Sequence, residues 1–332
     1  MTSWNWNRIR LGRGLLAGLG VALGLTWAVP VAAEGARDAK VVLLTVTDEC
    51  EFCAIHQRSF RKLTDAAGIR LTVKINNFDP AEQATQVDQA LAEHPDAIVL
   101  WPADISAIVP SLHKINRAGI PLVISDSKPE DKYASLWQTY AGIDNYAAGQ
   151  TAARLMIQGF RDKGYGDTGK VFIVIGVPGT APQVMRQAGF TDTLAEEAPG
   201  IRIAGVQPGN WDQTQAGTAA AGLFTQNGND VQGVYAQADN MMTGVITAAQ
   251  RAGIDVEKLV LVGQDCSIDG VRNIESGAQY GSVLFSPVGD GEYAARAVID
   301  ILDGKEVPHE MIMPSPAITR ENVTECYAAI GR

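Results

Sequence analysis

Apolar and polar positions follow two alternating patterns along almost the whole chain. Short, continuous apolar runs predict buried strands, and the segments between them carry apolar residues at helical spacing. In the segment 54–67, for example, Ile55, Phe60 and Leu63 fall on one side of a helix. The predicted strands cover residues 41–46, 71–75, 97–101, 121–125, 170–175, 201–207, 233–236, 260–263 and 282–285. The predicted helices cover residues 54–67, 81–92, 107–118, 146–159, 181–195, 213–226, 241–252, 269–276 and 291–302.

This alternation predicts the fold class. Continuous apolar strands separated by helices are typical of parallel sheets that are covered on both faces. Right-handed crossovers make such sheets doubly wound. The predicted strands are too many for one comfortable open sheet, and a chain of 332 residues is longer than one core usually serves. We therefore expect an α/β protein with two doubly wound parallel-sheet lobes.

The N-terminus has the pattern of a secretory signal peptide. Three arginines, at positions 8, 10 and 13, precede an apolar run over residues 15–27. Val31-Ala32-Ala33 then places small residues at both key positions of a cleavage site. An uncleaved membrane anchor is the alternative, which the short, glycine-rich run disfavours. We predict that residues 1–33 are a signal peptide cleaved near Ala33 and that the mature chain is periplasmic.

Charge narrows the classes of partner. The chain has 37 acidic and 27 basic residues, for a net charge of −10, and the predicted signal peptide holds only basic ones. Because an acidic surface repels phosphate backbones, its charge disfavours nucleic-acid binding, and we expect no nucleic-acid partner. The turn at residues 176–179 lacks the Gly and Lys positions of a nucleotide-binding P-loop, and we expect no cofactor.

Polar and aromatic residues gather where the predicted strands end. In a doubly wound sheet the ligand lies outside the carboxyl ends of the strands, next to helix N-termini. Carboxylates and guanidinium groups bind neighbouring hydroxyls, and aromatic faces pack on the C–H faces of a sugar ring. The candidate ligand-binding residues are Phe52, Trp101, Asp126, Ser127, Arg186, Trp211, Asp239, Asp265 and Phe285. The alternative is structural: the aspartates would be helix N-caps and the aromatics core residues.

Several segments also carry a family resemblance through their order and spacing. They are AIVLWPAD (97–104), GIPLVISDS (119–127), GIDNYAAG (142–149), GVPGTAPQVMRQAGF (176–190), residues 234–249 and VGQDCSIDG (262–270). In this order they resemble the periplasmic sugar-binding proteins of ABC importers, of the ribose- and galactose-binding kind. The resemblance implies two lobes that close on one ligand like a clam shell. It implies crossovers near Ile143, Ser286 and Pro316, a first lobe of residues 34–143 plus 286–315, and a second of residues 144–285 plus 316–332.

The resemblance also implies roles for individual residues. Asp126 and Asp265 match the family's ligand-binding acids, and Arg186 matches the arginine that clamps the ring oxygen and hydroxyls. Trp211 falls where an aromatic residue stacks on the sugar, and Phe52 matches the aromatic residue of the first lobe.

Four positions depart from the family pattern. Phe285 replaces an amide residue at the last crossover, and Ser127 replaces a basic residue. Ala238 stands where an asparagine is common, and Cys53 replaces a second aromatic residue. The departures imply a ligand that is smaller, less hydroxylated or more apolar than a pentose or hexose.

The cysteines raise a separate set of alternatives. Cys50 and Cys53 form a C-x-x-C pair at a strand-to-helix turn, and in an exported protein we favour a disulfide between them. Reactive thiols are one alternative, and a thiol–disulfide or metal-dependent function with His56 is another. Neighbouring acids oppose thiolate formation, and a closed zinc site would need a fourth ligand that is not obvious nearby. A Cys266–Cys326 bridge stays open, because sequence alone does not choose among the pairings.

These observations favour a binding protein over an enzyme. We expect a monomeric periplasmic receptor that captures a small polar ligand, most readily a sugar or polyol, and delivers it to an inner-membrane ABC permease. No nucleophile, base and orienting group can be assembled at sensible positions, and we expect no metal site. Besides the thiol or metal function at Cys50, Cys53 and His56, the remaining alternative is a ligand-sensing partner of a chemoreceptor or sensor kinase.

Overall fold

The computed structural model describes residues 35–227 and 230–332. The predicted signal peptide, residues 1–33, therefore lies outside the described residues. In the part of the chain that is described, no helix combines the length and apolar character needed to cross a membrane.

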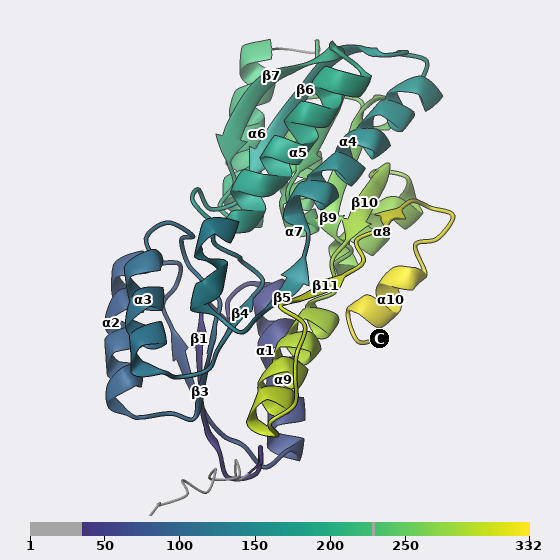
Figure 1. The fold of residues 1–332 in the computed structure, drawn as a ribbon. Helices are drawn as coiled ribbons and strands as arrows, with labels where there is room; N and C mark the ends of the chain where they lie inside the picture. The colour runs from purple at the N-terminus through teal and green to yellow at the C-terminus, as the bar shows by residue number, and fades with distance from the viewer. Residues whose placement is uncertain (1–34, 228–229) are drawn as a thin grey trace, which may run out of the picture. The chain divides into compact units, whose positions relative to one another are not determined.

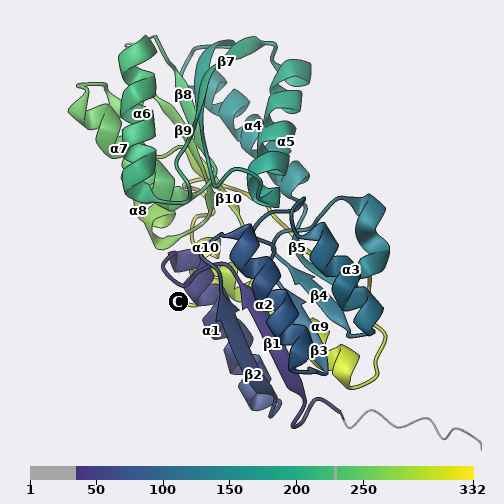
Figure 2. The same ribbon diagram turned by 90° about the vertical axis from the view of Figure 1, so that its left-hand side faces the viewer.

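Two six-stranded sheets form the framework (Figures 1 and 2). The first has the order β11-β5-β4-β3-β1-β2, and all of its neighbouring strands are parallel. Its strands are β1 (Lys40–Thr45), β2 (Arg70–Ile75), β3 (Ala97–Leu100), β4 (Leu122–Ser125), β5 (Thr139–Ile143) and β11 (Glu310–Met313). The second has the order β12-β10-β9-β8-β6-β7, and only β12 runs antiparallel to its neighbour. Its strands are β6 (Thr168–Ile175), β7 (Gly200–Pro208), β8 (Gly233–Ala236), β9 (Val260–Asp265), β10 (Gly281–Leu284) and β12 (Ala317–Ile318).

Helices cover both faces of each sheet, as the continuous apolar strands predict. On the first sheet α1 and α9 share one apolar core, and residues of α2 and α3 share another. On the second sheet α4 and α5 cover one face, and α6 and α7 cover the other. The helices are α1 (Glu51–Ala66), α2 (Pro80–Ala92), α3 (Val109–Ala118), α4 (Asn145–Asp162), α5 (Ala181–Glu197), α6 (Gln213–Asn227), α7 (Asp239–Arg251), α8 (Ile268–Ser276), α9 (Pro287–Leu302) and α10 (Glu325–Ala329), with short 3₁₀ turns η1 (Asp131–Leu136) and η2 (Val256–Lys258).

The chain passes between the two sheets three times. It crosses from β5 into α4, from β10 into α9, and from β11 to β12. These passages fall at Ile143, at Ser286 and just before Ala317. The two-lobed α/β fold with three crossovers is therefore confirmed, while the residue boundaries of the lobes stay a prediction.

The sequence pattern missed the short elements at the crossovers. β5 reads Thr-Tyr-Ala-Gly-Ile, which offers no continuous apolar run, and β11 lies at a sheet edge with exposed residues. The first helix also starts earlier than predicted, at Glu51. Its N-cap is Cys50, whose Sγ accepts a hydrogen bond from the backbone N of Cys53 at 3.0 Å, and cysteine is not a usual capping residue.

We predict that Gly149→Ala destabilises the protein by about 1–3 kcal/mol, because overpacking forces two elements apart. Gly149 lies where α4 meets α5, and a Cβ there would stand 2.2 Å from the backbone O of Arg186. The matched control is Gly222→Ala in α6, where a Cβ would meet nothing within 4 Å. Since alanine is the better helix former, the control should gain about 0.5–1 kcal/mol. Urea unfolding of both variants tests this, and equal effects would contradict the close contact.

Candidate functional site

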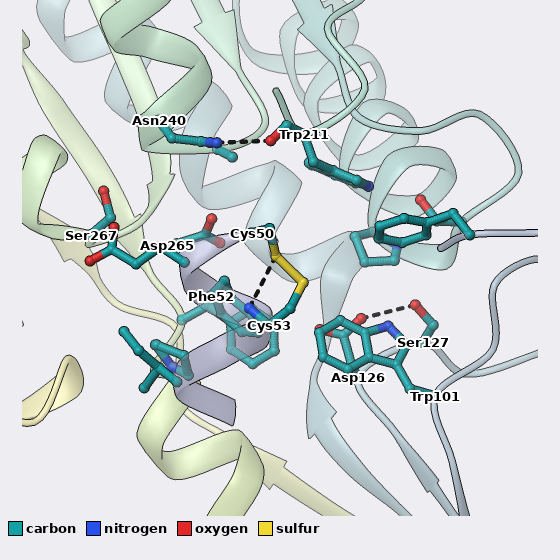
Figure 3. Close-up of a pocket in the computed structure, with 18 of the residues that line it drawn as sticks. Cys50, Phe52, Cys53, Trp101, Asp126, Ser127, Trp211, Asn240, Asp265 and Ser267 are labelled. Carbon is teal, nitrogen blue, oxygen red and sulfur yellow. Dashed lines mark hydrogen bonds between the residues drawn. A yellow bond between two sulfur atoms is a disulfide. The ribbon is translucent and has the colours of Figure 1, made fainter. Parts of the chain in front are cut away.

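One pocket gathers most of the candidate residues. It lies at the carboxyl ends of strands from both sheets and encloses about 760 Å³, counted out to open solvent (Figure 3). Eight of the nine predicted ligand-binding residues line it: Phe52, Trp101, Asp126, Ser127, Arg186, Trp211, Asp265 and Phe285. Further lining residues are Cys50, Glu51, Cys53, Ile55, Phe78, Thr180, Pro182, Ala238, Asn240, Ser267, Pro287 and Ile330. The rule that ligands bind beyond parallel strands accounts for this grouping.

Strained backbone marks the pocket wall. Phe78, Asp126, Trp211 and Asp265 have φ angles of 61°, 60°, 61° and 91°, in the region that favours glycine. Each such residue costs about 1–3 kcal/mol unless its surroundings hold it in place. Four of them lining one pocket indicate that the fold holds these side chains for a purpose other than its own stability.

Arg186 is the one cationic side chain among the described pocket residues. It is 3% exposed and lies on α5. Its Nε donates to Asn145 Oδ1 and its Nη1 to the carbonyl O of Gln237, both at 2.9 Å. The guanidinium also lies 5.6 Å from the centre of the Phe285 ring. These contacts fix its direction toward the cleft.

Two carboxylates face Arg186 from different lobes. Asp126, directly after β4, is 2% exposed, and burial raises its pKa to about 6, although the charge of Arg186 opposes the rise. Its Oδ1 accepts a hydrogen bond from Ser127 Oγ at 2.9 Å. Asp265, at the end of β9, has Oδ1 3.6 Å from Nη1 of Arg186. Burial raises its pKa to about 8, again against the effect of Arg186.

Aromatic rings form the apolar walls. The ring centres of Phe52 and Phe285 are 4.7 Å apart, and those of Phe52 and Trp101 are 6.0 Å apart. Trp211 stands on the second lobe, where Asn240 Nδ2 donates to its backbone O at 2.8 Å. A Cβ at Gly176 would lie 1.9 Å from Cζ2 of the Trp211 indole, so only glycine leaves room for this ring. The pocket therefore pairs flat apolar faces with carboxylates and a guanidinium.

Asp239 is the predicted ligand-binding residue that does not line the pocket. It is fully buried at the start of α7, and burial raises its pKa to about 7. Its carboxylate accepts hydrogen bonds from Ser282 Oγ, Gln279 Nε2 and the backbone N of Ser267. The structure thus places Asp239 behind the wall, where it holds the loop that follows Asp265.

Sequence reasoning passed over some of the lining residues. Phe78 comes from the loop after β2, and the carboxyl-end rule would have included that loop had it been applied to the second strand. Ile330 follows α10, and no local pattern pointed to it. Its position depends on a contact between distant parts of the chain.

Both cysteine pairs are disulfides. Cys50 and Cys53 are bridged with a Cα–Cα distance of 5.3 Å, and Figure 3 shows this bridge at the pocket. Cys266 and Cys326 are bridged at 5.4 Å, which anchors α10 beside Asp265. Ser286 Oγ, at a crossover, donates to Ala329 O at 2.8 Å, so the C-terminal segment is held from two sides.

The Cys50–Cys53 bridge leaves no thiolate at these positions to hold a metal ion or to act as a free reactive thiol. His56 is fully buried, with Nε2 2.9 Å from Ser125 Oγ and 3.5 Å from Asp290 Oδ2. Burial lowers the pKa of His56 to about 3 and raises that of Asp290 well above its usual value, so the pair favours its uncharged form. Among residues 35–227 and 230–332, no three His, Cys, Asp or Glu side chains are arranged to hold a metal ion.

Comparisons of sequence and of fold both match most of this chain to periplasmic binding proteins. Residues 41–306 match the model of a family described as "Periplasmic binding protein domain". The chain is 26% identical over 288 residues to the ribose import binding protein of Bacillus subtilis, covering 87% of this chain and 90% of that protein. It is 29% identical over 316 residues to the xylitol-binding protein of Mycolicibacterium smegmatis, covering 93% and 86%. A solved periplasmic solute-binding protein from Actinobacillus succinogenes with bound D-allose superposes with a TM-score of 0.76, at 24% identity, covering 87% of this chain and 100% of that one.

We predict unequal roles for the two disulfides in stability. The Cys266–Cys326 bridge spans a sequence separation of 60 and the Cys50–Cys53 bridge one of 3. From loop-closure entropy, losing the first should cost about 4 kcal/mol and losing the second about 2 kcal/mol. Urea unfolding of the Cys266→Ala/Cys326→Ala and Cys50→Ala/Cys53→Ala variants tests the order. A larger loss from the short bridge would contradict it.

Asp265→Asn should stabilise the ligand-free protein at pH 8 and leave it nearly unchanged at pH 4. Between pH 3.8 and about 8 native Asp265 keeps a proton that the unfolded chain releases, so its contribution to stability falls as pH rises. Asparagine removes this loss, and each kcal/mol gained should raise the melting temperature by about 1.5 °C in a chain of this length.

The control for this pH series is Asp269→Asn. Asp269 lies four residues further on, outside the pocket, with a side chain that is 30% exposed and near Arg272. Because its side chain is partly exposed, this variant makes the same Asp→Asn change without relieving a comparable burial. A gain that is the same at pH 4 and pH 8 for Asp265→Asn would contradict the assignment to its carboxylate.

Proposed function

The chain belongs to the periplasmic binding protein family, and from this membership and the pocket we infer that it captures a sugar or polyol. It is a solute-binding protein of an ABC importer for such ligands, and the family consists of transport receptors rather than enzymes. The curated relatives named above are a ribose import binding protein and a xylitol-binding protein. Their names support a polyhydroxylated ligand for this chain without specifying which one.

One observation carries the proposal: charged and aromatic side chains from both lobes line the same pocket. Asp126 and Trp101 come from the first sheet, and Arg186, Trp211 and Asp265 come from the second. Hydroxyl groups of a ligand would bridge the charged groups, and the rings would pack on its C–H faces. Each lobe contributes part of each set, so only a ligand held between the two lobes makes all of these contacts.

We propose clam-shell closure as the mechanism. A ligand bound to one lobe gains contacts with the other only when the lobes approach, so binding favours the closed state by the free energy of those added contacts. In this proposal Asp126, Arg186 and Asp265 fix the hydroxyl directions, while Phe52 and Trp211 enclose the carbon frame. Phe285, in place of an amide, adds an apolar face beside Arg186.

Family membership also suggests where the protein works and which protein it delivers its ligand to. We propose that residues 1–33 are removed near Ala33 on export to the periplasm and that the mature protein acts as a monomer. The closed form would present a surface that an inner-membrane permease recognises. Both disulfides are compatible with an oxidising compartment.

Trp211→Ala should weaken ligand binding by about 2 kcal/mol or more, roughly 30-fold, because a buried aromatic anchor is lost. A thermal-shift panel of pentoses, hexoses and polyols, including D-ribose and xylitol, would first choose the ligand. Calorimetry would then compare the variant with the parent protein.

The matched control is Met185→Ala. Met185 neighbours Arg186 on α5, is 40% exposed and does not line the pocket, so its truncation should leave affinity unchanged. Equal affinities for Trp211→Ala and the parent would show that the pocket has been assigned to the wrong residues. A folded protein that responds to no carbohydrate or polyol in the panel would overturn the proposed function.

A further inference from the structure

We propose that the ligand of this pocket carries a positively charged amine on a small polyhydroxylated frame. This inference rests on the proposed function and narrows its ligand class. It starts from the charges that line the pocket, which do not balance.

Three carboxylates and one guanidinium line the pocket. The acids are Glu51, Asp126 and Asp265, and Arg186 is the only cation among the described lining residues. At Ser127, where the resemblance leads to a basic residue, a hydroxyl stands instead. Arg58, Arg272 and Arg332 act on Glu51 from outside the pocket, but Arg186 is the cation whose charge acts on Asp126 and Asp265. Among the side chains that line the pocket, acids therefore outnumber cations three to one.

Arg186 is already engaged by the protein. Two of its nitrogens donate to Asn145 and to the carbonyl of Gln237, and its face lies over Phe285. It approaches Asp265 only to 3.6 Å, outside ordinary hydrogen-bond distance. One guanidinium held in this way does not neutralise carboxylates on both lobes.

The carboxylates keep their ligand-facing oxygens open. Asp126 is 2% exposed; Ser127 donates a hydrogen bond to its Oδ1, and the Trp101 side chain also acts on its carboxylate as a donor. No donor within the described residues makes a hydrogen bond to the Asp265 carboxylate. Burial already favours the protonated forms of both groups, and closing the lobes on a neutral polyol would remove more water without supplying a positive charge that keeps them ionised. An ammonium group between them would supply it, with donors for both lobes.

The aromatic residues fit the same ligand chemistry. Phe52, Trp101, Trp211 and Phe285 line the pocket together with the acids. A cation over an aromatic face is attracted by the ring quadrupole, most strongly over tryptophan and when water is excluded. The walls that pack on C–H groups of a carbon frame therefore also favour a cation attached to it.

The test compares ligands that differ only in one amine. The pairs are sorbitol and 1-amino-1-deoxysorbitol, glucose and glucosamine, and myo-inositol and an amino-deoxy-inositol. Calorimetry at pH 7 with the mature, disulfide-bonded protein measures each pair, with Asp265→Asn as the variant. The control is Asp88→Asn on α2, which is 56% exposed, paired with Lys114 and outside the pocket. We expect the amine to bind at least 10-fold more tightly in at least one pair. Asp265→Asn should abolish that preference, and Asp88→Asn should retain it.

The outcomes separate this inference from the proposed function. If neutral members bind as tightly as their amines or more tightly, the amine inference falls and sugar or polyol capture stands. If the amine is preferred equally by the parent and by Asp265→Asn, the carboxylate is not what selects it, and the inference falls as well. If folded protein binds no member of any pair and no other carbohydrate, both proposals fall.

Discussion

The arrangement of this protein depends on one buried cation. Arg186 is 3% exposed, yet it reaches the start of α4, the end of β8 and the ring of Phe285 at a crossover. Burying a guanidinium is costly unless it is paired and hydrogen-bonded; Asn145 and Gln237 supply the hydrogen bonds, and Asp126 and Asp265 lie near enough to supply the opposite charge. The same side chain is the main favourable charge for Asp126 and Asp265. Arg186 thus connects the packing of the second lobe to the chemistry of the pocket.

The acids around this cation are kept at a cost to the unliganded fold. Burial raises the pKa of Asp126, Asp265 and Asp290, so each resists ionising where it stands. Strained backbone at Asp126 and Asp265 adds to the cost. A fold under selection for stability alone would place apolar residues here. This loss of stability is concentrated at the pocket, which is typical of functional sites.

The sequence predicts the long strands and helices well because each has one regular pattern of apolar residues along its whole length. Continuous apolar strands and amphipathic helices are local patterns, and the carboxyl ends of parallel strands then follow from topology. The short strands at the crossovers escaped because β5 and β11 are positioned by partners far along the chain. Asp239 shows why the sequence does not predict the direction of every side chain. It follows the carboxyl end of β8, where the rule expects ligand contacts, but hydrogen bonds from Ser282 and Gln279 hold its carboxylate behind the pocket wall. Ile330 reaches the pocket only through a bridge that joins residues 266 and 326, which no local pattern shows.

That bridge has a consequence for the order in which the protein matures. A chain is made from its N-terminus, so Cys326 emerges 60 residues after Cys266. Cys266 sits next to Asp265 and cannot be bridged before its partner has been made. The bridge that holds the loop carrying Asp265 can therefore form only after the strands of both described sheets have been made. A chain that lacked residues 326–332 would keep both sheets and most of the pocket, but it would lose Ile330 from the lining and the bridge that fastens the wall beside Asp265.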